Sequence, residues 1–278
     1  MKTIDLNNAN TLDQLTAMVV GHSGAGKTRH AGTWPRPVFL SDSSEHGWTT
    51  LYNMPDGDLY EGGRLPKVVG IESAADMITC LNALKDQANG HKAKVPGWPL
   101  GQGKWECGTV VIDTLTFYAD AYLAELEATS QDKDKRRIYG ALAQHLRYLQ
   151  IEFHKLPYNI LWLALSSVNE DSTERGALVA GQMAAKAPAR CDLWLYLQEV
   201  RRPKGKTTDV VYKAHTRTYA GNKARHRFGD MLPDEIDPYY ATIEECLGMK
   251  PWTDRITTKV STSAKAPARK PATRATAR

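Results

Sequence analysis

Eight residues near the start of the chain match the pattern G-x-x-x-x-G-K-[ST] at every fixed position. They are Gly21, His22, Ser23, Gly24, Ala25, Gly26, Lys27 and Thr28. Glycines in this pattern allow backbone N–H groups to curl around phosphate oxygens, and the helix that follows directs its positive dipole end at them. A chance match in a chain of average composition is on the order of 1%. The pattern therefore predicts a loop that holds a nucleoside triphosphate, with ATP and Mg²⁺ as the cofactors.

The predicted site also includes a cation and a hydroxyl within the loop and two acidic residues outside it. Within the loop, Lys27 is expected to reach the β- and γ-phosphates, and the Thr28 hydroxyl is expected to ligate Mg²⁺. Asp113 ends a β-branched run, where P-loop enzymes place an acid that holds Mg²⁺. Glu45 follows the next apolar run after the loop, so it is predicted to orient the water that attacks the γ-phosphate. Asp42 lies on the same segment and is the alternative.

Apolar runs alternate with helical patterns along the chain. Five runs predict buried strands: Ala17–Gly21, Pro37–Leu40, Thr109–Asp113, Asn159–Leu165 and Asp192–Leu197. A capping sequence at Ser73 opens one helical pattern, and two more follow at Tyr118–Leu126 and Ile138–Phe153. This alternation predicts an α/β fold with a mostly parallel central sheet and helices on both faces. Val210–Tyr219 is expected to form one arm of a hairpin.

Three segments lack such periodicity and are predicted to be loops. Residues 53–70 and 89–103 are rich in Gly and Pro, and residues 169–190 are polar and rich in Gly and Ala. From about residue 257 the composition is Ala, Lys, Arg, Pro, Ser and Thr, which predicts a disordered tail. We therefore expect one domain over residues 1–256 and a disordered basic tail over residues 257–278.

Charge is unevenly distributed between these two parts. The net charge is +5, but the segment 259–278 alone carries six basic residues and no acid, which leaves about −1 for the rest. Such a tail is expected to contact nucleic acid through charge, without reading sequence. No apolar run approaches the roughly 18 residues of a membrane span, no signal-peptide pattern is present, and the four cysteines are far apart. These features predict a cytoplasmic protein with free buried thiols and no membrane partner.

A family resemblance joins these motifs. The segment Phe39–Gly47 resembles the second-strand region of RecA-like recombinases, and Val110–Leu115 resembles their Walker B strand. Together with Gly181–Leu197 and Lys223–Arg227, the body from about residue 15 to 245 resembles the phage Sak-type, RecA-core single-strand annealing proteins. The resemblance implies a RecA-like ATPase core, assembly into a homo-oligomeric ring or filament, and single-stranded DNA as partner. A single-strand DNA-binding protein is a further partner to expect.

The resemblance also implies roles for several polar residues. RecA itself carries a γ-phosphate-sensing Gln after the fourth of the predicted strands, whereas this chain has Ser166 and Ser167, of which Ser166 is taken as the phosphate contact. The segment after it faces DNA in RecA-like proteins, so three of its cations, Arg175, Lys186 and Arg190, are predicted to bind DNA phosphates.

Lys223 and Arg225 alternate with Ala224, so on an extended segment both side chains would face the same way. In RecA-like assemblies the matching region supplies cations to the neighbouring subunit's γ-phosphate, and this gives both residues a predicted catalytic role in trans. A solvated basic strand or another DNA contact is the alternative. Trp162 and Trp194 lie in strand patterns and are predicted to be buried in the core.

The leading functional prediction is a DNA-stimulated ATPase that binds single-stranded DNA and promotes annealing or strand pairing in phage recombination, in the host cytoplasm if it is phage-encoded. Two alternatives remain open. One is a RecA-fold helicase or helicase loader. The other is a P-loop small-molecule kinase, for which the chain offers no clear lid over the phosphates; Lys133, Lys135, Arg136 and Arg137 are a weak candidate.

Overall fold

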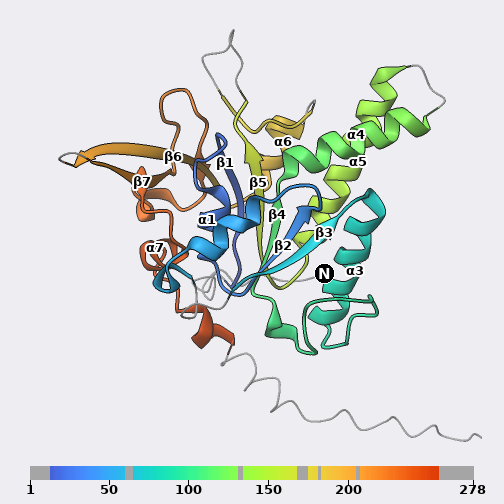
Figure 1. Ribbon diagram of the computed structural model, residues 1–278, viewed down its shortest axis with the longest axis horizontal. Helices are drawn as coiled ribbons and strands as arrows, with labels where there is room; N and C mark the ends of the chain where they lie inside the picture. Colours follow the sequence, from blue (N-terminus) through green and yellow to red (C-terminus); the bar gives the residue numbers. More distant parts are fainter. Residues whose placement is uncertain are drawn as a thin grey trace, which may run out of the picture.

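A computed structural model describes residues 13–59, 65–130, 134–167, 175–180, 183–204 and 207–256 (Figure 1). Its centre is a nine-stranded sheet with the order β3-β2-β4-β5-β1-β6-β7-β9, in which β8 also pairs with β6. The strands from β3 to β6 are parallel, and the remaining pairings are antiparallel. The strands are β1 (Thr16–Gly21), β2 (Pro37–Asp42), β3 (Lys67–Ile71), β4 (Thr109–Asp113), β5 (Asn159–Leu165), β6 (Leu193–Lys204), β7 (Thr207–His215), β8 (Arg225–His226) and β9 (Glu235–Ile236).

Helices cover both faces of this sheet, as the alternation predicts. One face carries α3 (Ala74–Ala88), α4 (Leu115–Thr129), α5 (Lys135–Phe153) and α6 (Met183–Ala189). The other carries α1 (Lys27–Gly32), the 3₁₀ segment η2 (Gly47–Asn53) and α7 (Tyr240–Cys246). Short 3₁₀ turns also occur at η3 (Asp56–Asp58), η4 (Lys104–Glu106) and η5 (Gly229–Met231). The mostly parallel α/β fold is therefore confirmed.

Local sequence explains where two of the long helices begin. The Ser73 hydroxyl accepts a hydrogen bond from the Asp76 backbone N–H at 3.2 Å, which caps α3 as predicted. The Thr114 hydroxyl accepts one from the Phe117 N–H at 3.3 Å and caps α4 directly after β4. Because Thr114 follows Asp113, this cap fixes the carboxyl end of β4, where the predicted metal ligand Asp113 lies.

The long β6–β7 hairpin confirms the expected hairpin arm, although β7 ends at His215 rather than Tyr219. Only residues 193–196 of β6 pair with β1, while the rest of β6 pairs with β7 and projects from the body (left in Figure 1). Trp162 and Trp194 are buried, also as predicted.

Two predicted loops contain regular structure. Residues 67–70 belong to β3, which pairs with β2 at the edge of the sheet, so the prediction of a loop over 53–70 is wrong there. Within 169–190, residues 183–189 form α6, whose Met183 and Ala187 are buried against the sheet. Residues 168–174 and the predicted tail at 257–278 lie outside the described residues.

The chain after β8 is part of the same body. Leu232, Ile236, Tyr240 and Ile243 are buried in the core on the α1 face. Arg255, near the end of the described chain, donates from Nη2 to Glu244 Oε1 and to the Tyr240 hydroxyl, both at 2.7 Å. Residues 232–255 therefore help to enclose α1.

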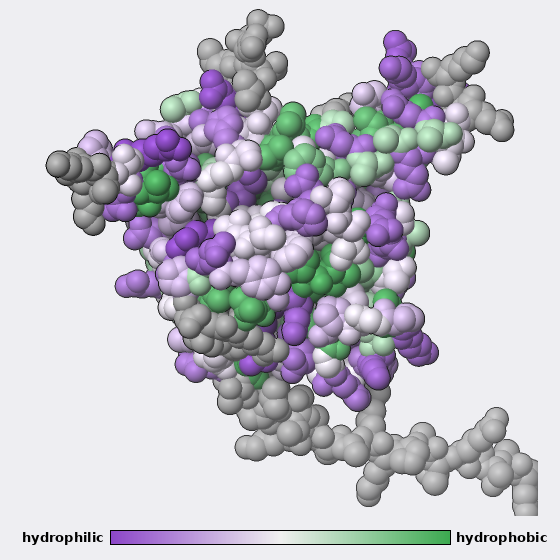
Figure 2. Space-filling model, viewed as in Figure 1, coloured by the Kyte–Doolittle hydropathy of each residue, from purple (hydrophilic) through white to green (hydrophobic). Residues whose placement is uncertain are grey.

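The surface in view carries hydrophobic residues in separate small areas among hydrophilic ones (Figure 2). None of the helices in the described part of the chain combines the length and hydrophobicity needed to cross a membrane. All four cysteines are free; Cys80, Cys107 and Cys191 are buried, and Cys246 is half-buried.

Candidate active site

The predicted phosphate loop joins β1 to α1, and its glycines are required by its geometry. Gly24 and Gly26 have φ values of 80° and 87°, in the left-handed region that other residues avoid. A side chain on Gly21 would lie 2.8 Å from the Leu197 carbonyl oxygen of β6. The loop therefore passes close to the neighbouring strand, and one of its N–H groups, that of Ala25, donates to the His22 carbonyl at 3.2 Å.

Lys27 is held inside this loop. Its Nζ donates to the carbonyl oxygens of Gly21 at 3.0 Å and His22 at 2.9 Å. Burial lowers the pKa of Lys27 to about 8, and the nearby Asp113 carboxylate opposes that shift. A partly desolvated ammonium interacts more strongly with phosphate charge than one in bulk water does.

Thr28 and Asp113 meet across 85 residues of sequence. The Thr28 hydroxyl donates to Asp113 Oδ2 at 3.0 Å, which brings together the two predicted metal ligands. Burial raises the pKa of Asp113 to about 6; the Thr28 hydrogen bond and Lys27 lower it, and Glu45 adds to the increase. Hydroxyl and carboxylate oxygens are hard donors that suit Mg²⁺, which takes its remaining ligands from water and phosphate. The residues present therefore fit the predicted ion.

Glu45 and Asp42 lie in different places although they follow the same strand. Glu45 lines a hollow of about 440 Å³ over the phosphate loop, together with Lys27, Thr28 and Asp113. Asp42 instead accepts hydrogen bonds from the Ser44 N–H at 2.8 Å and the Ser44 hydroxyl at 2.5 Å, and it lines an adjoining cavity. Of the two carboxylates, Glu45 is the one that faces the phosphate loop.

Ser166 and Ser167 at the end of β5 also differ in their environment. Ser166 donates its N–H to the Gly21 carbonyl at 3.2 Å and is 5% exposed, and its hydroxyl has no hydrogen-bond partner among the described residues. The Ser167 hydroxyl accepts from the Gly176 N–H at 3.0 Å. Buried hydroxyls are normally paired, so Ser166 has hydrogen-bonding capacity beside the phosphate loop that Ser167 has already used.

Tyr212 is a site residue that the sequence does not reveal. It lies on β7, and a side chain on Gly26 would approach its Cδ1 to 2.7 Å, so the ring covers the phosphate loop. The Arg29 guanidinium lies 5.8 Å from the centre of the same ring. A second hollow of about 320 Å³ shares Gly26, Arg29 and Tyr212 with the first and continues towards Tyr239. The two hollows therefore adjoin each other at these three residues, beside α1.

The predicted DNA-binding and in-trans cations are brought into one region. Arg175 and Lys223 are joined through their backbones, since the Lys223 N–H donates to the Arg175 carbonyl at 2.8 Å. Ala224 is buried, and Arg225 beyond it is exposed and donates from Nη2 to the Pro188 carbonyl at the end of α6, at 3.3 Å. Lys223 and Arg225 thus flank a buried residue, as the alternation predicts.

A groove between α5 and α6 continues this region. It has a volume of about 570 Å³, and its lining includes Arg147, Lys186 and Arg190 with no acidic residue among the described ones. Arg147 was not expected from the sequence, because it lies on α5, far along the chain from the others. We call the combined set the basic stripe: Arg147, Arg175, Lys186, Arg190, Lys223 and Arg225.

Comparison with known proteins identifies the fold family. A family model described as an AAA domain matches residues 13–227, which include the phosphate loop, Asp113, Ser166 and the basic stripe. A separate comparison with curated proteins found no match. The complete loop, its joined Thr28–Asp113 pair and this match lead to one conclusion: the chain belongs to the AAA-domain family of P-loop ATPases.

Proposed function

We propose that the protein is an ATP-hydrolysing, single-stranded DNA-binding protein of the phage Sak type, which promotes strand annealing or pairing during recombination. The observation that carries the DNA assignment is the basic stripe, whose cations come from four separate parts of the chain and meet along α6 and β8. Assembly into a ring or filament belongs to the same proposal.

Hydrolysis is assigned to the residues around the phosphate loop. Lys27 and the loop N–H groups neutralise phosphate charge, and Thr28 and Asp113 would hold Mg²⁺, which supplies further charge stabilisation when bound. Glu45 orients the attacking water from its position on the hollow. The Ser166 hydroxyl is the group proposed to detect the γ-phosphate, since it is buried beside the loop and unpartnered among the described residues.

A short path links this site to the basic stripe. Ser167 exchanges hydrogen bonds with Gly176, and the Leu178 N–H donates to the Leu165 carbonyl at 2.7 Å. Arg175 is adjacent to Gly176 and is joined to Lys223. A change at the end of β5 on loss of the γ-phosphate would therefore be transmitted directly to the first cations of the stripe.

The stripe suits a DNA backbone better than it suits bases. Four of its cations are exposed, Arg175 and Lys223 are half-buried, and no aromatic side chain lines the described part of the groove. Such an arrangement neutralises phosphates and releases counterions, which gives sequence-tolerant binding that weakens with salt. This is the property that an annealing protein requires.

The test compares ATPase rate and DNA affinity in three variants. Removal of stripe cations (Arg147→Ser, Lys186→Ser and Arg190→Ser together) should reduce the salt-dependence slope of single-stranded DNA binding by about 2, at roughly 0.7 per lost phosphate contact. The matched control removes three exposed cations away from the stripe, by Lys67→Ser, Lys92→Ser and Lys94→Ser together. Lys27→Ala should abolish hydrolysis while circular dichroism shows a retained fold.

DNA stimulation of the ATPase in the unaltered protein, lost in the stripe variant, is the expected result. An ATPase that ignores single-stranded DNA, with equal DNA affinity in the stripe and control variants, would overturn the DNA assignment. ATP-dependent unwinding of a duplex, measured by strand separation, would indicate a helicase instead.

A further inference from the structure

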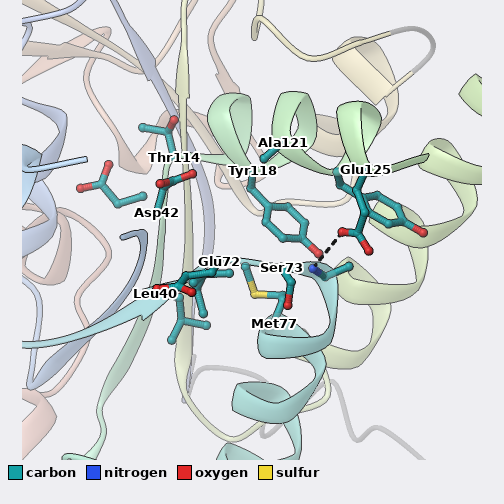
Figure 3. A pocket seen from close by; sticks show the side chains of 13 residues that line it. Leu40, Asp42, Glu72, Ser73, Met77, Thr114, Tyr118, Ala121 and Glu125 are labelled. Carbon is teal, nitrogen blue, oxygen red and sulfur yellow. Dashed lines mark hydrogen bonds between the residues drawn. The ribbon is translucent and has the colours of Figure 1, made fainter. Parts of the chain in front are cut away.

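A cavity lies beside the nucleotide site, on the other side of Asp113 and Thr114 from the phosphate loop. It has a volume of about 280 Å³ and is bounded by the ends of β2 and β3 and by helices α3 and α4. Figure 3 shows Tyr118 and Glu125 of α4 facing Ser73 and Met77 at the start of α3 across this space. Because Asp113 and Thr114 line both hollows, an occupant of the cavity would touch the metal-binding corner of the ATPase site.

The inner walls of the cavity are apolar. Leu40 and Met77 are each 1% exposed and form its interior with Ile71, which is 5% exposed. The rings of Tyr118 and Tyr122 line the α4 side, and Tyr118 is only 8% exposed. Walls of this kind favour a hydrocarbon or aromatic body over a hydrated inorganic ion.

Charged groups of one sign surround this apolar space. Asp42, Glu72, Asp113 and Glu125 all line the cavity, and the described lining includes no Lys, Arg or His. His145, behind the cavity wall, shares a 2.6 Å hydrogen bond with the Tyr118 hydroxyl; burial lowers the pKa of His145, and Glu125 opposes that shift. The side chains that line the cavity therefore disfavour an anionic ligand, although α3 and α4 both begin there and the Ala74 N–H donates to Glu125 Oε2 at 3.5 Å. A cationic group would meet carboxylates at the rim and the faces of two tyrosines.

We propose that this cavity binds a small organic cation, with an amidinium, guanidinium or ammonium group carried on an apolar or aromatic body. The apolar part would occupy the space between Leu40, Met77 and Tyr118, and the cationic group would face Glu72 and Glu125. Through Asp113 and Thr114 the occupant alters the rate of ATP hydrolysis. The inference does not depend on DNA binding, because it rests on the cavity alone.

The first experiment measures binding of benzamidine to the full chain by calorimetry, without nucleotide. Benzamide, which has the same ring and nearly the same shape but no charge, is the matched probe. We expect benzamidine to bind at least about tenfold more tightly than benzamide, since tenfold corresponds to 1.4 kcal/mol of charge-dependent interaction. The double variant Glu72→Gln with Glu125→Gln removes two charges with almost no change in side-chain shape. It should lose about three- to tenfold in benzamidine affinity.

The control variant is Glu127→Gln, which removes an exposed carboxylate of the same helix that does not line the cavity. It should bind benzamidine as the unaltered protein does. Equal binding of benzamidine and benzamide, no binding of either, or equal losses in the double and control variants would each overturn the proposal. A second readout is the ATPase rate with and without saturating benzamidine; an unchanged rate would contradict the coupling through Asp113. DNA binding is measured separately, so failure of either proposal leaves the other standing.

Discussion

At the scale of single residues, the two carboxylates after β2 illustrate how a small displacement decides a role. Asp42 is the last residue of β2 and bonds to Ser44, whereas Glu45 follows a turn in which its N–H donates to the Asp42 carbonyl at 3.1 Å. That turn directs Glu45 to the phosphate hollow and leaves Asp42 on the neighbouring cavity.

This placement yields a paired prediction. Glu45→Gln should retain ATP binding and slow hydrolysis by roughly 10²-fold or more, because an amide cannot accept the proton of the attacking water. Asp42→Asn, its matched partner, should hydrolyse ATP within a few fold of the normal rate. Single-turnover hydrolysis with ATP affinity measured in parallel would check both. The reverse pattern would assign the water to Asp42.

How much of the site the sequence predicts depends on whether its signal is local. The phosphate loop and Asp113 are identified by contiguous motifs, and the structure joins them through the Thr28 hydroxyl. Tyr212 has no such signal, because it reaches Gly26 only through the pairing of β7 with β6 and of β6 with β1. Nothing in the sequence distinguishes Arg147 from other arginines on helical surfaces. Only the packing of α5 beside α6 brings it to the groove with Lys186 and Arg190.

At the scale of elements, a buried histidine ties α1 to the chain before α7. His30 contacts the Pro238 carbonyl through Nδ1 at 2.8 Å, and its Nε2 accepts a hydrogen bond from the Trp34 indole at 3.1 Å. The neutral ring with its proton on Nδ1 satisfies both partners. A second proton would face the indole N–H, and burial lowers the pKa of His30 to about 4.

Stability should therefore fall in acid. The unfolded chain binds a proton on His30 below its ordinary pKa of 6.5, whereas the folded chain resists protonation down to about 4. The folded state thus loses stability as pH falls through this window, by up to about 3 kcal/mol from this residue. Urea unfolding at pH 7 and pH 5 should show a smaller difference in His30→Gln than in the control His91→Gln, an exposed histidine. Equal differences would contradict the assignment. His154, which pairs with Trp162 in the same way, still contributes in both variants.

Elements with strong periodicity were predictable, and those fixed by their neighbours were not. The fully buried β4 and the capped α3 follow from their own residues. In contrast, β3 is a five-residue strand beside a Gly/Pro-rich stretch, and it exists because β2 offers an edge to pair with. Helix α6 contains Pro188 and many alanines, and its buried Met183 and Ala187 stabilise it against the sheet.

At the scale of the whole molecule, Arg225 is the residue whose role depends on assembly. Its bond to Pro188 places it in the basic stripe, so under the DNA-binding proposal it contacts DNA rather than acting in trans. We expect Arg225→Ala to keep its DNA-free ATPase rate and to lose DNA affinity. An in-trans cation would be worth roughly 10³–10⁵ in rate, so the two outcomes are far apart. If Arg225→Ala is inactive, mixing it with Lys27→Ala subunits should restore part of the activity only if Arg225 acts across an interface.

The packing of residues 232–255 against α1 has a practical consequence for anyone who shortens the gene. The family match ends at residue 227, yet Tyr240, Ile243 and Trp252 beyond it are at most 3% exposed. A truncation at that boundary would uncover Trp34 and leave the phosphate-loop helix without its outer layer. We expect such a fragment to carry every recognisable motif and still aggregate on expression, whereas one that extends to residue 256 keeps the layer over α1.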